Sequence, residues 1–266
     1  MHRCYLLIFS LILFLSTPSF PAFEAENVLL LPVSKTYTFI PKDYFLEKKF
    51  IFSTAASQLY SMPECNQIYI GLLNMFPFAH LGADISFFGS ELYNETEIGI
   101  SILKGTKNLV GIRIKVMKLG IKGYEPRLYW SDDLLFISQN EFFYFQSTYN
   151  NALSYGYRYD EEKPVSSFSS LFRIYPSAWN SFNIKITFSD FTGSNFEIGN
   201  GINLSNILSI GGGLDLGTRS ISSSLLLSLA TSDLTYSVSI HPELGLTHTV
   251  GLIYSRVREK RVSSKE

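Results

Sequence analysis

Residues 79–87 read Ala-His-Leu-Gly-Ala-Asp-Ile-Ser-Phe, residues 95–102 read Glu-Thr-Glu-Ile-Gly-Ile-Ser-Ile, and residues 110–116 read Val-Gly-Ile-Arg-Ile-Lys-Val. In each segment apolar side chains occupy every second position, and polar or small residues occupy the positions between them. A strand places successive side chains on opposite faces, so this alternation indicates a strand with one apolar and one polar face. The polar connections 89–91 and 104–107 separate the segments. The stretch therefore predicts three consecutive strands that carry their charges on one common face.

The same alternation continues on both sides of this stretch. It recurs at 50–55, 68–72, 127–138, 141–149, 168–175, 182–189, 196–202, 208–216, 221–229, 234–240 and 246–254. The polar break at 150–167 is predicted to be a surface loop, because the strand pattern resumes after it. Helical periodicity is absent from the sequence, which argues against an α/β sheet. The sequence predicts an all-β, antiparallel protein of about 14 strands, with 12–14 as the range.

Composition decides between a soluble and a membrane protein. Charged residues make up 17% of the chain, below the roughly 25% of typical soluble domains. Aromatic residues reach 15%, with 22 Phe and 16 Tyr, which suits the apolar band and aromatic girdles of a membrane barrel. An open sheet would leave unpaired backbone groups in lipid, and closure removes that edge. We therefore expect an antiparallel transmembrane β-barrel, with a secreted soluble β-sandwich as the alternative.

The N-terminus has the pattern of a secretory signal. Residues 1–22 combine Arg3, an apolar run at 5–16 and a Pro- and Ser-containing end, and the run is too short to span a bilayer as a helix. An uncleaved anchor is the alternative. We expect the signal peptide to be cleaved and to direct the chain to the outer membrane of a diderm bacterium. Residues 23–46 are predicted to be a plug or periplasmic segment, 47–256 the barrel, and 257–266 a charged periplasmic tail.

The connections between predicted strands are unequal in length. If the first strand runs outward, the short breaks near 75–78, 104–107, 138–140 and 230–233 lie on the periplasmic side, and the long break at 150–167 lies outside. Short periplasmic turns and longer external loops are typical of outer-membrane barrels. After cleavage Cys65 is the one cysteine left, so no internal disulfide can support the fold.

Six charged or ionisable residues share the polar faces of the three quoted strands, and we predict that they form a lumenal charge cluster: His80, Asp84, Glu95, Glu97, Arg113 and Lys115. One interpretation is a site that selects or binds a solute. The other is a salt-bridge network that neutralises itself and fills the interior. The sequence contains neither a nucleophile elbow nor histidines and cysteines at metal-ligand spacing, so we expect no enzyme, cofactor or metal. The net charge of −1 argues against nucleic-acid binding.

Residues 82–90 (Gly-Ala-Asp-Ile-Ser-Phe-Phe-Gly-Ser), together with Leu92-Tyr93 and Glu95-Thr96, resemble a motif of PorV/PorQ-like outer-membrane proteins. Residues 60–64, 121–124 and 241–248 resemble further turns of that family. The turn residues that carry the resemblance are Phe88, Gly89, Ser90, Tyr93, His241, Pro242, Gly245 and His248. The resemblance implies a barrel similar to the fourteen-stranded long-chain fatty acid transporters, and some relatives serve in type IX secretion. This chain lacks the early Asn-Pro-Ala turn of the family and does not end on an aromatic residue.

These observations lead to one main functional expectation. We expect an integral outer-membrane β-barrel, PorV/PorQ-like, that acts in export-associated binding or in the passage of small hydrophobic solutes. A structural or partner-scaffolding barrel with a closed lumen is the first alternative, and the soluble sandwich is the second. The expected partners are outer-membrane lipid and a secretion-system or exported protein.

Overall fold

The computed structural model describes residues 48–62, 64–157, 164–189 and 193–257. The predicted signal peptide, the segment 23–46 and the charged tail lie outside these ranges. The strands are β1 (Lys48–Gln58), β2 (Asn66–Met75), β3 (His80–Gly89), β4 (Tyr93–Gly105), β5 (Asn108–Ile121), β6 (Arg127–Gln139), β7 (Phe143–Asn150), β8 (Ser154–Tyr155), β9 (Ser167–Ser177), β10 (Asn180–Ser189), β11 (Gly193–Asn203), β12 (Leu208–Asp215), β13 (Ser220–Ser228), β14 (Ser232–His241) and β15 (Gly245–Val257). A 3-10 turn, η1 (Leu59–Ser61), follows β1. Within the described ranges, no helix is long and apolar enough to cross a membrane.

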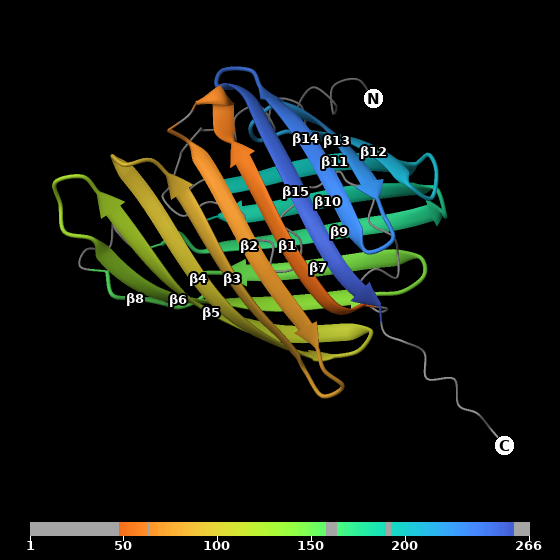
Figure 1. Ribbon diagram of the computed structural model, residues 1–266, viewed down its shortest axis with the longest axis horizontal. Helices are drawn as coiled ribbons and strands as arrows, with labels where there is room; N and C mark the ends of the chain where they lie inside the picture. The colour runs from red at the N-terminus through yellow and green to blue at the C-terminus, as the bar shows by residue number, and fades with distance from the viewer. Residues whose placement is uncertain (1–47, 63, 158–163, 190–192, 258–266) are drawn as a thin grey trace, which may run out of the picture.

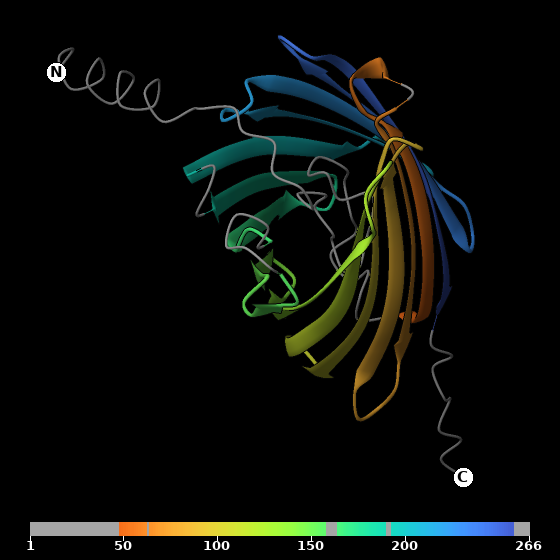
Figure 2. The same cartoon turned by 90° about the vertical axis from the view of Figure 1, so that its left-hand side faces the viewer.

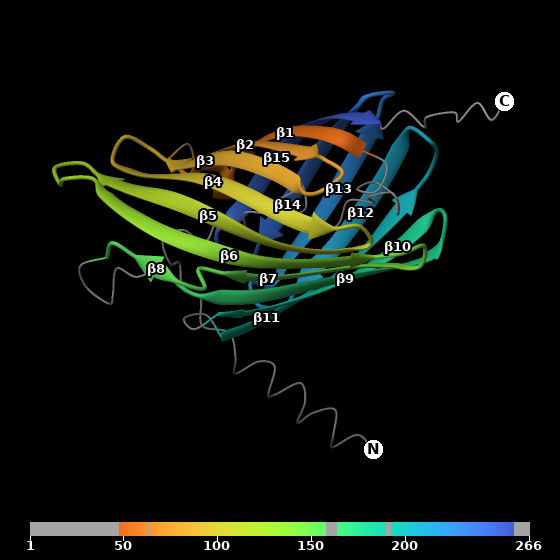
Figure 3. The same cartoon turned by 90° about the horizontal axis from the view of Figure 1, so that it is seen from below.

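The sheet closes on itself. Each long strand pairs antiparallel with the next long strand, and β1 pairs with β15 through registers such as Ile51↔Ser255 and Ala56↔Val250. Figure 1 shows β15 beside β1 in the front wall. Figure 2, turned by 90°, looks into the space that the strands enclose. Figure 3 shows β4, β5, β6, β7 and β9 side by side. Among the described residues, fourteen strands of at least eight residues form the ring, and β8 is a short addition. The predicted all-β, antiparallel barrel of about 14 strands is confirmed.

The two faces of the wall follow the alternation of the sequence. On β4, Ile98, Ile100 and Ile102 point outward and are at least half exposed, whereas Glu97 and Ser101 point inward and are buried. Large apolar side chains repeat this outward pattern around the barrel, on β2, β3, β5, β6, β13 and β15. An outward apolar face and an inward polar face are what a strand needs when lipid replaces water outside.

The barrel has two unlike ends. We call the end where β1 begins and β15 ends the terminal rim, and the opposite end the distal rim. At the terminal rim the connections are short turns of two to four residues, at 76–79, 106–107, 140–142, 178–179, 204–207 and 229–231. The longest connection, between β7 and β9, lies at the distal rim. The distal rim thus combines the long connection with short turns, at 90–92, 216–219 and 242–244, whereas the terminal rim has short turns throughout the described residues.

The start of the long polar segment belongs to the wall rather than to a surface loop. Asn151 has a φ of +53° and turns the chain so that β8 continues along β6, with Trp130↔Tyr155 and Ser131↔Ser154 as partners. Asn and Asp tolerate this left-handed conformation better than most residues, which explains a bulge here. Residues 151–155 therefore complete the second edge of β6, which the predicted surface loop 150–167 did not include.

Candidate functional site: the lumenal charge cluster

Five charged side chains from β3, β4, β5 and β6 meet inside the barrel: Asp84, Glu97, Arg113, Lys115 and Asp133. We call them the lumenal charge cluster. Arg113 stands at the centre and is fully buried. Its Nε donates to Asp84 Oδ1 at 3.0 Å, and its Nη2 donates to the second oxygen of the same carboxylate. Nη1 donates to Asp133 Oδ2 at 2.9 Å, and Nη2 also contacts Glu97 Oε1 at 2.5 Å. One guanidinium therefore joins three strands besides its own.

Lys115 completes the cluster from the position two residues further along β5. Its Nζ lies 2.7 Å from Asp133 Oδ1 and 3.9 Å from Glu97 Oε2. Three carboxylates face two cations, so the group carries one excess negative charge when all its members are ionised. Charges removed from water need such close partners, because the interior screens them weakly. The geometry holds each charge in one place, as expected for a brace across four strands.

Two glycines make room for large lumenal side chains, one of them Arg113 at the centre of the cluster. A Cβ added at Gly99 would lie 2.4 Å from Arg113 Nε, so the guanidinium occupies the space that any larger residue would need. On β2, the ring of Tyr69 lies over Gly71, where a Cβ would come within 2.5 Å of the tyrosine hydroxyl. Glycine in a strand interior often marks such a close approach. The glycines of the alternating pattern thus serve the packing of large lumenal side chains.

The structure brings together four of the six residues predicted for this cluster. Asp84, Glu97, Arg113 and Lys115 meet, but His80 and Glu95 lie elsewhere on the lumenal face. His80 begins β3 near the terminal rim, in register with Met75 and Leu103. Glu95 lies near the distal rim and accepts a hydrogen bond from Tyr93 Oη.

Asp133 is the member that sequence reasoning missed. It follows Asp132 in a segment whose alternation is interrupted, and Asp132 points to the opposite face. The parity of Tyr129, Ser131 and Leu135, which all point inward, is the signal that could have placed it.

The predicted family motif near Phe88 forms a tight turn at the distal rim. Gly89 has a φ of +103°, and a Cβ there would lie 2.1 Å from Tyr93 O. Ser90 N donates to Tyr93 O at 2.7 Å, and the rings of Phe88 and Tyr93 pack edge to face. Only glycine fits this turn, because a side chain would collide with the backbone.

The second motif turn, between β14 and β15, is fixed by a histidine. His241 Nδ1 accepts from Glu243 N at 3.2 Å and from Leu244 N at 3.1 Å, and so bridges the turn that contains exposed Pro242. Gly245, with a φ of +98°, begins β15 opposite His241. His248 lies on the outward face, where its Nδ1 and Tyr236 Oη are 2.9 Å apart. These contacts set the register of the last hairpin.

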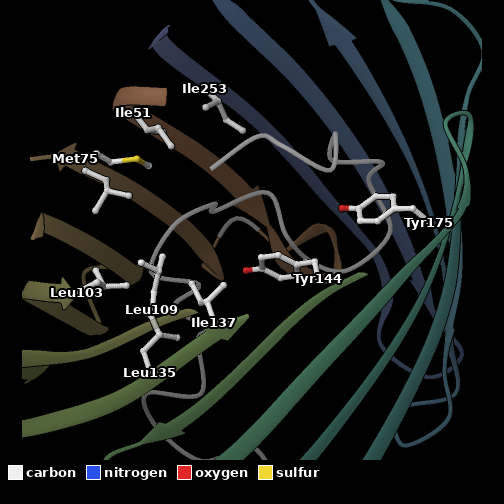
Figure 4. Close-up of a cluster of buried hydrophobic side chains, with 10 residues drawn as sticks. Ile51, Met75, Leu103, Leu109, Leu135, Ile137, Tyr144, Tyr175 and Ile253 are labelled. Atoms are coloured by element: carbon white, nitrogen blue, oxygen red, sulfur yellow. The ribbon is translucent and has the colours of Figure 1, made fainter. Parts of the chain in front are cut away.

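Apolar side chains also line the lumen, close to the terminal rim. We call this group the lumenal apolar cluster, and it comprises Ile51, Leu73, Met75, Leu103, Leu109, Leu135, Ile137, Tyr144, Tyr175 and Ile253. Figure 4 shows the aliphatic members on one side and the rings of Tyr144 and Tyr175 on the other, all pointing inward. Sequence reasoning missed this cluster, because it assigned the apolar residues to the outer face.

Comparisons with known proteins bear on the fold. No family model matches the chain, and no curated protein matches its sequence. Among solved structures, the outer membrane protein Omp33 of Acinetobacter baumannii aligns over 79% of this chain and 99% of its own, with a TM-score of 0.51 and 5% identity. The KdgM porin (TM-score 0.44, 8% identity, 77% of this chain, 99% of its own) and a substituted Rh. blastica porin (0.46, 5%, 78%, 99%) are less similar in overall geometry. The chain thus has the fold of an outer-membrane, porin-like β-barrel.

Proposed function

We propose that this chain is an integral outer-membrane β-barrel, PorV/PorQ-like, whose lumen binds small hydrophobic solutes for passage or for export-associated transfer. The observation that carries the proposal is the lumenal apolar cluster. Its members lie inside the barrel, where a water-filled porin presents polar side chains. A solute that buries about 100 Å² of apolar surface against them would gain about 2.5 kcal/mol.

The outward face supports the membrane location. A closed sheet leaves no unpaired edge, and its outward isoleucines and leucines need an apolar solvent. Trp130 and Trp179 are more than half exposed at opposite rims, where interfacial aromatic residues are enriched in barrels. Lipid is therefore the first partner of this surface, and the barrel fold of Omp33 is consistent with that assignment.

A barrel with a closed lumen that scaffolds a secretion-system or exported protein is the second candidate. The lumenal charge cluster favours it, because salt bridges across four strands make that part of the wall rigid. The two candidates differ in whether an apolar molecule reaches the lumenal apolar cluster.

Photolabelling tests this difference. The protein in lipid nanodiscs is exposed to the apolar probe 3-trifluoromethyl-3-phenyldiazirine, irradiated, and mapped by mass spectrometry. We expect labels on the peptide around Leu103 and Leu109 that are saturable and competed by excess toluene. Leu109→Thr should reduce this labelling, whereas the matched variant Val110→Thr, whose side chain faces lipid, should not. Labels confined to lipid-facing residues would overturn solute binding and leave the scaffold.

A further inference from the structure

A second arginine inside the barrel lacks the carboxylate partners that hold Arg113. Arg173 lies on the lumenal face of β9 and is only 2% exposed. Its Nε donates to Asn183 Oδ1 on β10 at 2.5 Å. In the described part of the chain, no carboxylate lies within ion-pair distance of its guanidinium. A buried cation without a counter-charge is costly, so this arrangement calls for an anion.

The neighbours of Arg173 on the same row have unused hydrogen-bonding groups. The register runs from Gln139 on β6 through Tyr144 on β7 and Arg173 on β9 to Asn183 on β10, and then to Gly199 on β11. Among the residues that the structure describes, buried Asn183 Nδ2 has no hydrogen-bond partner, and neither amide atom of buried Gln139 has one. Buried polar groups nearly always have hydrogen-bond partners. Two unsatisfied amides in register with an arginine that has no carboxylate partner among the described residues therefore point to a ligand.

The donor set selects the chemistry of that ligand. A guanidinium offers two parallel N–H groups that match the two oxygens of a carboxylate, and the Asn183 amide adds a further donor beside them. One positive charge balances one negative charge, so a carboxylate is neutralised whereas a phosphate dianion would leave excess charge in the interior. We propose that Arg173 and Asn183 form a lumenal binding site for the carboxylate group of a solute.

The site adjoins the lumenal apolar cluster. Tyr175 follows Arg173 by two residues on the same face of β9, and Tyr144 is the register partner of Arg173 on β7. Both rings belong to the lumenal apolar cluster and point inward (Figure 4). A small organic acid can therefore place its carboxylate on Arg173 and its apolar body against the tyrosines. The inference rests on the proposed function, since it names the polar group of the solute that the lumen takes.

The test compares a carboxylate with its neutral isostere. Binding of 4-fluorobenzoate and of 4-fluorobenzamide to the full chain in detergent is followed by 19F NMR, against detergent alone. We expect saturable binding of the benzoate, and Arg173→Gln should weaken it at least about tenfold, the loss of a charge-assisted hydrogen bond. Binding of the benzamide should stay within about twofold, because its contacts are apolar. A double variant, Lys185→Gln with Glu197→Gln, removes a neighbouring ion pair at constant net charge and serves as the matched control.

A second variant keeps the proposal testable if Arg173→Gln fails to fold. Asn183→Asp is nearly isosteric and supplies a carboxylate at the position that now contacts the guanidinium. It should fold and abolish benzoate binding, because the internal carboxylate occupies the site. Equal benzoate affinity in wild type and in Asn183→Asp, or the absence of saturable binding in wild type, would overturn the site. The neutral diazirine labels the lumenal apolar cluster without needing Arg173, so failure of the carboxylate site is distinguishable from failure of the proposed function.

Discussion

Replacing Arg113 by methionine tests whether the lumenal charge cluster braces the barrel. The variant keeps most of the side-chain volume but leaves Asp84, Glu97 and Asp133 with Lys115 as the one cation of the cluster. The excess negative charge of the group rises from one to two. Removing one partner of a buried ion pair typically costs about 3–5 kcal/mol of unfolding free energy, because the remaining charge is left buried without compensation.

The free energy of unfolding is measured by urea titration of the barrel in vesicles, with the fluorescence of Trp130 and Trp179 and heat-dependent gel migration as probes. We expect Arg113→Met to lose about 4 kcal/mol at pH 7.

A double variant, Arg113→Met with Asp84→Asn, controls for the loss of packing. It has the same excess charge as wild type and should recover at least half of the lost stability. A single variant within about 1 kcal/mol of wild type, or a double variant no more stable than the single one, would refute the electrostatic reasoning.

The other predictions use the same titration. Gly99→Ala should lower the free energy of unfolding by about 1–3 kcal/mol, because the added Cβ overlaps the Arg113 guanidinium. In the Arg113→Met background the same change should lower it by less than about 1 kcal/mol. Equal losses in both backgrounds would contradict the steric explanation. Ile100→Arg, on the lipid face near the middle of β4, should lower the free energy of unfolding by about 2–4 kcal/mol, whereas Ile121→Arg at the end of β5 should lower it by at most about 1 kcal/mol. The opposite order would place the apolar band elsewhere on the barrel. Asn151→Ala should lower the free energy of unfolding by about 2–3 kcal/mol, because the variant loses two side-chain hydrogen bonds and places alanine at a positive φ. An unchanged stability would mean that the bulge does not support the wall.

The alternation of apolar and polar residues predicted most of the fold. Strands with one apolar face, such as β3 and β4, could be assigned to a face by parity alone, and the structure has Leu81 and Ile100 outside and Asp84 and Glu97 inside. The method works there because lipid and lumen impose opposite demands on neighbouring positions.

The same method fails where both faces are apolar. Residues 134–137 read Leu-Leu-Phe-Ile, and here Leu135 and Ile137 point into the lumen while Leu134 and Phe136 face outward. A run of apolar residues carries no period of two, so the lumenal apolar cluster could not be predicted from it.

Arg173 and Asn183 were missed for a related reason. Their strands were predicted correctly, but which side chains meet across strands depends on the register. Arg173 and Asn183 meet in the hairpin of β9 and β10, whose register shifts between Asn180 and Phe182, and this irregularity left no periodic signal in the sequence.

The contrast between the two buried arginines indicates what each part of the wall is for. Arg113 has three carboxylates within 3.0 Å, so further ligands would have to displace bonds that already exist. Arg173 has a single amide oxygen as its protein partner among the described residues, with an unused N–H donor on that same amide. Both side chains are buried to the same degree, so the desolvation cost of the cation is similar, and only the Arg113 cost is offset by the protein itself. Selection for stability alone would give Arg173 a counter-charge or replace it by an apolar residue, because apolar residues of similar volume are often at least as stabilising as a buried ion. An interior charge that the fold leaves uncompensated is therefore better explained by a ligand than by packing, and the carboxylate titration with Asn183→Asp decides that question directly.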